Sequence, residues 1–149
     1  MKIAIAGDHA GFALKQFLLE RLGHEGVTLV DLGSFDQTPS DYPDFARLLG
    51  GAILDGRADR GILVCGSGVG ACVAANKIKG IRAGLCHDTY SAHQGVEHDD
   101  INILCLGSRV VGTDLALDII HAYLGATFSF EDRHVRRLTK ILDIENRQR

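Results

Sequence analysis

A cysteine at the start of a glycine-rich turn is the feature of the sequence best suited to chemistry. Cys65 ends a short apolar run and is followed by Gly66-Ser67-Gly68-Val69-Gly70. A turn of this kind that leads into a helix directs several backbone N–H groups at one point, where the helix dipole also favours negative charge. We therefore predict that the turn binds an anion and stabilises the thiolate of Cys65, which could then act as a general base.

The same turn allows other interpretations, and the sequence leaves two of them open. Gly66, Gly68 and Ala71 match the dinucleotide pattern G-x-G-x-x-A, but the match lies in the third strand-helix unit instead of the first. The lysine of a Walker A loop is missing, and Ala71 stands where a cysteine phosphatase would have its arginine. A tight turn without a ligand and a nucleotide-binding module without catalysis both remain alternatives, and a lone cysteine is often a buried hydrophobic residue.

Polar side chains also follow the first and the last predicted strands. Asp8 and His9 come directly after the strand at 2–6, and Ser108 with Arg109 follows the strand at 102–106. Because ligands bind beyond the carboxyl ends of parallel strands, we expect these residues to converge with Cys65. His9 could also be a structural histidine.

Two further groups lie on predicted helices. His98 closes a helix and is followed by Asp99, a position that suits either a site residue or a structural one. Arg133 and Arg137 are four residues apart on the last helix and therefore share one face. They could grip a phosphate together or form a solvated basic face.

The elements that must position these residues follow from hydrophobic patterning. Apolar runs rich in Val, Ile and Leu alternate with longer amphipathic stretches, which is typical of strand-helix units around a parallel sheet. We predict strands at 2–6, 27–32, 60–65, 81–86 and 102–106. We predict helices at 12–22, 42–54, 71–75, 90–97, 115–124 and 133–145. The fold class is therefore α/β, with a three-layer, doubly wound sheet of about five parallel strands and a C-terminal helix.

Composition restricts the class of protein. The 149 residues, 46% hydrophobic and 23% charged, fit a single globular domain over 1–149. A formal net charge of -3 lacks the basic balance that nucleic-acid binding requires. The four cysteines show neither a C-x-x-C pair nor the spacing of a zinc site, so we predict reduced thiols and no metal. The N-terminus reaches a charge after few apolar residues, so we predict no signal peptide, no membrane span and a cytoplasmic location.

Motifs spread over nearly the whole chain resemble the ribose-5-phosphate isomerase B family, and Arg133-His134 with Arg137 continues the pattern into the last helix. The motifs are Gly7-Asp8-His9-Ala10-Gly11-Phe12, Asp41-Tyr42-Pro43, Cys65-Gly66-Ser67-Gly68-Val69-Gly70, Ala75-Asn76-Lys77 with Gly80-Ile81-Arg82-Ala83, and Gly107-Ser108-Arg109-Val110-Val111-Gly112. The resemblance implies a Rossmann-like fold and a metal-free, cofactor-free interconversion of ribose 5-phosphate and ribulose 5-phosphate. It also implies active sites shared between subunits of a homodimer or a dimer of dimers.

The resemblance assigns roles to the candidate residues. The residue matching Cys65 moves the proton between C1 and C2, and the residue matching Ser67 assists proton traffic at the substrate oxygens. Amides of the turn, including those of Gly66, Gly68, Val69 and Gly70, would hold the enediolate. The residue matching His98 is associated with opening of the furanose ring.

The remaining roles concern the phosphate and the hydroxyl groups of the sugar. The phosphate would lie among residues that match His9, Arg109, Arg133 and Arg137, and Asp8 matches a residue that contacts sugar hydroxyls. One position departs from the family pattern, because Asp99 stands where family members commonly have asparagine after the histidine. An ionised carboxylate only accepts hydrogen bonds, so the alternative substrates are other sugar phosphates of four to six carbons.

Overall fold

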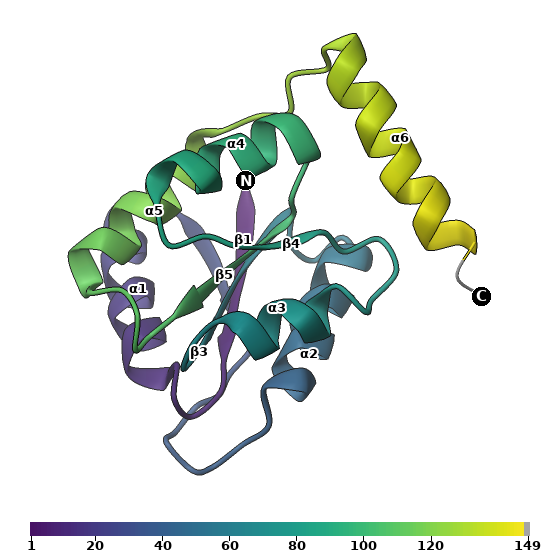
Figure 1. Ribbon diagram of the computed structural model, residues 1–149. Helices are drawn as coiled ribbons and strands as arrows, with labels where there is room; N and C mark the ends of the chain where they lie inside the picture. Colours follow the sequence, from purple (N-terminus) through teal and green to yellow (C-terminus); the bar gives the residue numbers. More distant parts are fainter. Residues whose placement is uncertain (148–149) are drawn as a thin grey trace.

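The protein alternates strands and helices along its length, and the computed structural model describes residues 1–147 (Figure 1). The strands are β1 (Lys2–Gly7), β2 (Thr28–Asp31), β3 (Arg60–Cys65), β4 (Ala83–Leu85) and β5 (Ile103–Gly107). The helices are α1 (Phe12–His24), α2 (Tyr42–Leu54), α3 (Val69–Ala75), α4 (Thr89–Asp99), α5 (Thr113–Gly125) and α6 (Asp132–Arg147). Among residues 1–147, no helix combines the length and the apolar character that crossing a membrane requires.

The strands form one parallel sheet in the order β2-β1-β3-β5-β4, which confirms the predicted α/β class. Side chains alternate between the two faces of each strand, and both faces of the central strands are covered. Helices α1, α4 and α5 pack on the face that carries Ile5, Val64 and Leu106. Helices α2 and α3 pack on the other face, which carries Ala6, Cys65 and Cys105. The result is the predicted three-layer, doubly wound architecture.

Most predicted boundaries lie close to the observed ones, but β4 is shorter than the predicted strand at 81–86. The amide of Ile81 donates to the carbonyl of Ile78 within a turn, and the amide of Arg82 donates to the Asn102 side chain. The amides of these two residues therefore bond outside the ladder, and β4 begins only at Ala83. Helix α3 begins earlier than predicted because the Ser67 hydroxyl accepts the Val69 N–H at 3.2 Å.

An ion pair with a buried lysine fastens α1 to the last residue of β2. The Lys15 side chain has no exposed surface, and its Nζ lies 2.7 Å from Asp31 Oδ1. The same oxygen accepts the Gly33 N–H at 3.0 Å. Gly33 in turn is hydrogen-bonded to β1, because its carbonyl accepts the Gly7 N–H at 2.8 Å. The pair therefore fixes the start of the loop that runs past the carboxyl end of β1.

Helix α6 covers neither face of the sheet and lies beside the body of the molecule (Figure 1). It is attached near both ends. His134 in its first turn is 1% exposed, and Glu145 in its last turns accepts the Gly80 N–H at 2.9 Å. Between these anchors, the apolar side chains of Val135, Ile141 and Ile144 are exposed. The apolar stripe of α6 is thus not buried within its own chain.

Candidate active site

Three adjacent strands, β1, β3 and β5, end at the same edge of the sheet, and the order in which the chain adds strands reverses between β1 and β3. Such a reversal point opens a crevice between the loops. The loops are bonded to each other: the Ser108 N–H donates to the Cys65 carbonyl at 2.8 Å, and the Arg109 N–H donates to the Gly66 carbonyl at 3.0 Å. The Ser108 hydroxyl donates to the Ala10 carbonyl at 2.7 Å. The structure therefore brings the three predicted strand exits together.

A pocket of about 330 Å³ opens at this edge. It is lined by Asp8, His9, Ala10, Tyr42, Cys65, Gly66, Ser67, Gly70, Arg109 and Val110. Cys65 is 4% exposed, and that surface faces the pocket. Cys65 thus borders the pocket while its surroundings are largely dry, which strengthens electrostatic interactions at its sulfur.

The sulfur of Cys65 has a backbone donor at close range. The Gly68 N–H donates to Cys65 Sγ at 3.1 Å. A donor of this kind bonds a thiolate more strongly than a thiol, because a charged acceptor makes the stronger hydrogen bond. Gly68 has φ of 78°, and an added Cβ would lie 2.9 Å from the backbone carbon of Leu106. Only glycine fits this position, and the turn therefore aims an amide at the sulfur.

Of the other amides of the turn, one is bonded within the turn and another belongs to a residue that lines the pocket. The Val69 N–H donates to Ser67 Oγ, so the Ser67 hydroxyl takes one amide of the first turn of α3. Gly70 lies in the first turn of α3, where an N–H has no partner within the helix, and Gly70 lines the pocket. Two of the amides that the sequence assigned to an anion are thus bonded to side chains of the turn itself.

Asp8 and His9 are held by neighbouring loops. Asp8 is 6% exposed, and its Oδ1 accepts the Gly11 N–H at 3.0 Å, which fixes the exit of β1. His9 Nδ1 lies 3.1 Å from both the amide nitrogen and the carbonyl oxygen of Ser40. The His9 ring is therefore held through Nδ1, and Nε2 is left for a ligand.

Arg109 supplies positive charge at the pocket. A Cβ added to Gly66 would lie 3.1 Å from Arg109 Nη1, so the guanidinium extends over the glycine-rich turn. Among residues 1–147, no carboxylate forms an ion pair with Arg109. The charge of Arg109 is consequently free to bind an anionic group.

Tyr42 also lines the pocket, although its residue type and spacing suggest no chemical role. Its ring packs against the turn, because a Cβ added to Gly70 would lie 2.7 Å from the ring carbon Cζ. The only signal was its place in the motif Asp41-Tyr42-Pro43. Gly70 is thus required for the close approach of the tyrosine.

The remaining predicted site residues lie elsewhere in the chain. His98 and Asp99 end α4, which precedes β5 and therefore ends at the amino edge of the sheet, opposite Cys65. Arg133 and Arg137 lie on α6. None of these four residues lines the pocket of Cys65. A single chain therefore separates the predicted site residues into two groups.

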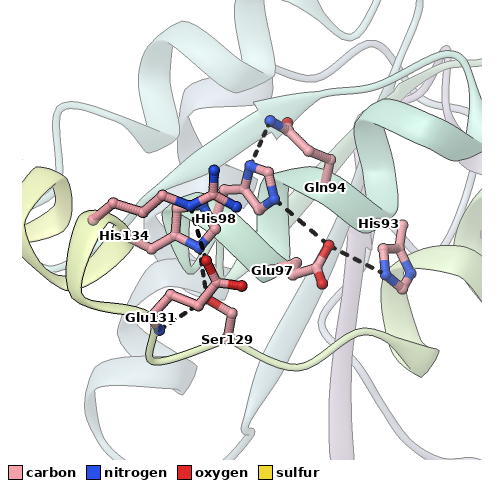
Figure 2. A network of polar contacts seen from close by, with 8 residues as sticks. His93, Gln94, Glu97, His98, Ser129, Glu131 and His134 are labelled. Atoms are coloured by element: carbon pink, nitrogen blue, oxygen red, sulfur yellow. Dashed lines mark hydrogen bonds and ion pairs between the residues drawn. The ribbon is translucent and has the colours of Figure 1, made fainter.

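The second group is organised by a polar network that joins α4 to the start of α6 (Figure 2). The rings of His98 and His134 stack with centroids 3.9 Å apart. Ser129 Oγ lies 2.6 Å from His134 Nδ1, and Arg133 Nε donates to Glu131 at 2.8 Å. No role for His134 is predictable from the sequence, because its burial depends on α6 returning to α4.

Burial alters the protonation of His134. Desolvation lowers the pKa of His134 below its usual 6.5, and the neighbouring His98 and Arg133 lower it further. The buried Nε2 of the ring has no hydrogen-bond partner among residues 1–147. The folded protein therefore favours the neutral form of His134.

The other cysteines differ from Cys65 in position. A hydrogen bond to Cys105 is the largest cause that lowers the pKa of Cys72 to about 7, whereas burial raises the pKa of Cys86 to about 11. The contact with Cys72 raises the pKa of Cys105 well above the usual value. None of these three thiols lines the pocket. Within residues 1–147, no cluster of histidine, cysteine and carboxylate side chains is arranged to hold a metal ion.

Comparison with known proteins identifies the family. The family model described as Ribose/Galactose Isomerase matches residues 3–141. The chain belongs to the Ribose/Galactose Isomerase family. The match covers both groups of candidate residues, so the pocket and the α4–α6 network both lie in the part of the chain that this family shares.

Relatives in the Ribose/Galactose Isomerase family match almost end to end. Ribose-5-phosphate isomerase B of Escherichia coli (strain K12) is 44% identical over 147 residues, covering 99% of this chain and 98% of that protein. D-erythrulose-4-phosphate isomerase of Pectobacterium atrosepticum is 45% identical over 130 residues, covering 86% and 85%. The solved structure of Clostridium thermocellum ribose-5-phosphate isomerase B has a TM-score of 0.97, with 45% identity and full coverage of both chains.

Proposed function

We propose that the protein interconverts ribose 5-phosphate and ribulose 5-phosphate through a cis-enediolate, with Cys65 as the general base and without a metal ion. The observation that carries the proposal is the Gly68 N–H at 3.1 Å from Cys65 Sγ in a pocket that also holds Arg109. A sulfur with a backbone donor and a nearby cation suits removal of a carbon-bound proton from an anionic sugar. Two of the relatives bear the name of this activity.

In the proposed reaction Cys65 takes the proton from C2 of the open-chain aldose and returns it to C1. One base suffices, because a cis-enediolate presents both carbons on the same face. Ser67 moves the hydroxyl proton between O2 and O1. Amides of the turn without an internal partner, that of Gly70 among them, stabilise the negative oxygen, which lowers the barrier because this charge develops only during the reaction.

The phosphate is bound at the far end of the substrate by His9 and Arg109. His9 offers Nε2 because Ser40 holds Nδ1, and Arg109 offers an unpaired guanidinium. Asp8 lines the same pocket as these groups and Cys65, which suits a contact with sugar hydroxyls. The reacting carbons are thereby placed at Cys65.

We further propose that the complete site forms between two copies of the chain. Arg133 and Arg137 of the second protomer add to the phosphate site, His98 of that protomer opens the furanose ring, and Asp99 contacts a sugar hydroxyl. Exposed apolar side chains support this arrangement, since Val69 and Val73 on α3 and Val110 at the pocket are exposed, and α6 exposes its own apolar stripe. Burying both surfaces would favour a homodimer or a dimer of dimers.

A substrate panel tests the activity. Purified protein is treated with a chelator and assayed for ketose formation from ribose 5-phosphate, erythrose 4-phosphate and the 6-phosphates of allose and galactose. We expect ribose 5-phosphate to have the highest kcat/KM. A preference for the four-carbon sugar would favour the activity named for the Pectobacterium relative, which Asp99 also allows. Micromolar binding of nucleotides with no turnover of any sugar phosphate would contradict the isomerase activity. We propose that the enzyme acts in the cytoplasm, as predicted from the sequence.

Mixing two inactive variants tests the shared site. Cys65→Ala and Arg137→Ala each disable both sites of their own homodimer. A mixed dimer has one site with both changes and one site with neither, so random exchange restores about a quarter of the wild-type activity per chain. Absence of any recovery in a sample shown to contain mixed dimers would contradict a site built from two protomers.

A further inference from the structure

His98 receives a hydrogen bond that the reaction above does not use. Gln94 lies one helical turn earlier on α4, and its amide Nε2 is 3.0 Å from His98 Nδ1 (Figure 2). An amide NH₂ group can only donate, so His98 Nδ1 is the acceptor. The proton of a neutral His98 ring is therefore on Nε2.

The second ring nitrogen faces an acceptor. His98 Nε2 lies 3.7 Å from the Glu97 carboxylate, which also lies 3.7 Å from His93 Nε2. An ionised carboxylate favours a ring nitrogen that carries hydrogen. The Glu97 carbonyl accepts the Ser129 N–H at 3.0 Å, which ties this part of α4 to the segment before α6. Gln94 and Glu97 thus favour the same tautomer from opposite sides of the ring.

The plane of the His98 ring is held by its stacking partner. The rings of His98 and His134 are inclined by 26° with centroids 3.9 Å apart. His134 cannot easily rotate, because it is 1% exposed and bonded to Ser129. The orientation of His98 is therefore fixed by stacking, and its tautomer by hydrogen bonding.

We propose that Gln94 is a positioning residue that keeps His98 as the neutral tautomer with the proton on Nε2, ready for donation to the ring oxygen of a furanose. This inference rests on the proposed function. In the step, the C1–O4 bond breaks and O4 takes the proton from Nε2. The proton leaves O1 as the C1=O1 bond forms, and it returns to Nε2 through water. Gln94 remains bonded to Nδ1 throughout, as orienting partners of functional histidines do.

Two substitutions separate the tautomer from the shape of the side chain. Gln94→Glu replaces the donor with an acceptor of the same size, which moves the proton to Nδ1. Gln94→Met removes the donor and leaves both tautomers populated. Gln16→Glu, at an exposed position on α1, is the matched control for the added charge. Thermal melts establish that each variant is folded.

The first readout is the side-chain ¹H–¹⁵N correlation spectrum of His98, assigned by comparison with His98→Asn and recorded where the ring is neutral. We expect Nε2–H in the wild type and in Gln16→Glu, and Nδ1–H in Gln94→Glu. The second readout is kcat for ribose 5-phosphate, which should fall roughly 10- to 100-fold in Gln94→Glu with a smaller change in KM, as for lost orienting partners of functional histidines. The kcat of Gln94→Met should lie between those of the wild type and Gln94→Glu.

A wild-type ring protonated on Nδ1, or a Gln94→Glu variant that switches tautomer at unchanged kcat, would overturn the assignment. The spectrum is recorded without substrate. If the wild type turned over none of the sugars, the proposed function would fail, and the spectrum would still decide whether Gln94 sets the tautomer.

Discussion

The backbone amide of Gly68 donates to the sulfur of Cys65 at 3.1 Å, and the left-handed conformation of Gly68 is what places it there. Gly68→Ala forces a Cβ against the backbone of Leu106 and Gly107. We expect a loss of about 3 kcal/mol in the free energy of unfolding, since backbone strain adds to the clash. Activity per folded molecule should fall roughly 10-fold or more, because the amide moves away from the sulfur.

Gly56→Ala is the matched control for the strain. Gly56 has φ of 72°, and no atom lies within 4 Å of the position that its Cβ would take. This variant should lose only about 1 kcal/mol in urea unfolding and keep full activity. Equal losses of stability and activity in Gly68→Ala and Gly56→Ala would show that the close approach of Gly68 to Leu106 and Gly107 does not fix the turn.

Cys65→Ala should abolish isomerisation while the protein stays folded. A positioned general base contributes roughly 10²- to 10⁴-fold, so kcat should fall by at least that lower figure while KM changes little. Cys86→Ala is the control, because Cys86 is buried on the opposite face of the sheet and does not line the pocket. Ketose formation from ribose 5-phosphate measures both. Wild-type kcat in Cys65→Ala would remove the thiol from the mechanism.

The protonation of His134 should make stability fall in mild acid. The pKa of His134 in the folded protein is lower than 6.5, so below pH 6.5 the unfolded chain binds the proton first. The stabilisation is complete above that pH and is lost as pH falls toward the folded pKa. The charged and titratable groups that act on the ring are His98 on α4, Glu131 before α6, and Arg133 and Arg137 on α6, and Glu97 lies 3.7 Å from His98.

Urea unfolding between pH 5 and 8 checks this expectation. His134→Phe keeps an aromatic ring against His98 and removes the titrating group. Below pH 6.5 the unfolding free energy of the wild type should fall relative to that of His134→Phe. A difference independent of pH would contradict the lowered pKa of His134.

Breaking the ion pair of Lys15 and Asp31 should have unequal effects on its two members. Asp31→Asn leaves the fully buried ammonium of Lys15 without its counter-charge, which costs about 3 kcal/mol. Lys15→Met should cost about 1 kcal/mol or less, because the Asp31 side chain is 26% exposed and keeps the Gly33 N–H. The double variant should resemble Lys15→Met in urea unfolding. Equal costs of the two single changes would contradict this account.

Sequence patterning predicted those parts of the fold that local rules control. The helix at 42–54 and the strand at 60–65 have the predicted ends, because apolar runs and turn residues mark them directly. The convergence of Cys65 with Asp8 and Arg109 also followed, since it depends only on the carboxyl ends of parallel strands. The strand at 81–86 was predicted too long, because a side chain of the distant Asn102 takes the Arg82 amide.

Other features depend on contacts that no local pattern encodes. Tyr42 begins a helix, and only the close approach to Gly70 brings it to the pocket. Gln94 is an ordinary helix residue until His98 receives its bond, and His134 is buried only because α6 returns to α4. The separation of His98 and Arg137 from Cys65 in one chain follows from the direction of α4 and the position of α6, which periodicity does not specify.

The two strands that border the sheet are its shortest, with four residues in β2 and three in β4, whereas those between them have five or six. A short border leaves few unpaired main-chain groups for a foreign strand to add to. Cross-β stacking of copies therefore has little template in the folded state, even though much of the interior is Val, Ile and Leu. The molecule can therefore expose apolar helix surfaces to a partner without also exposing a long unpaired strand edge.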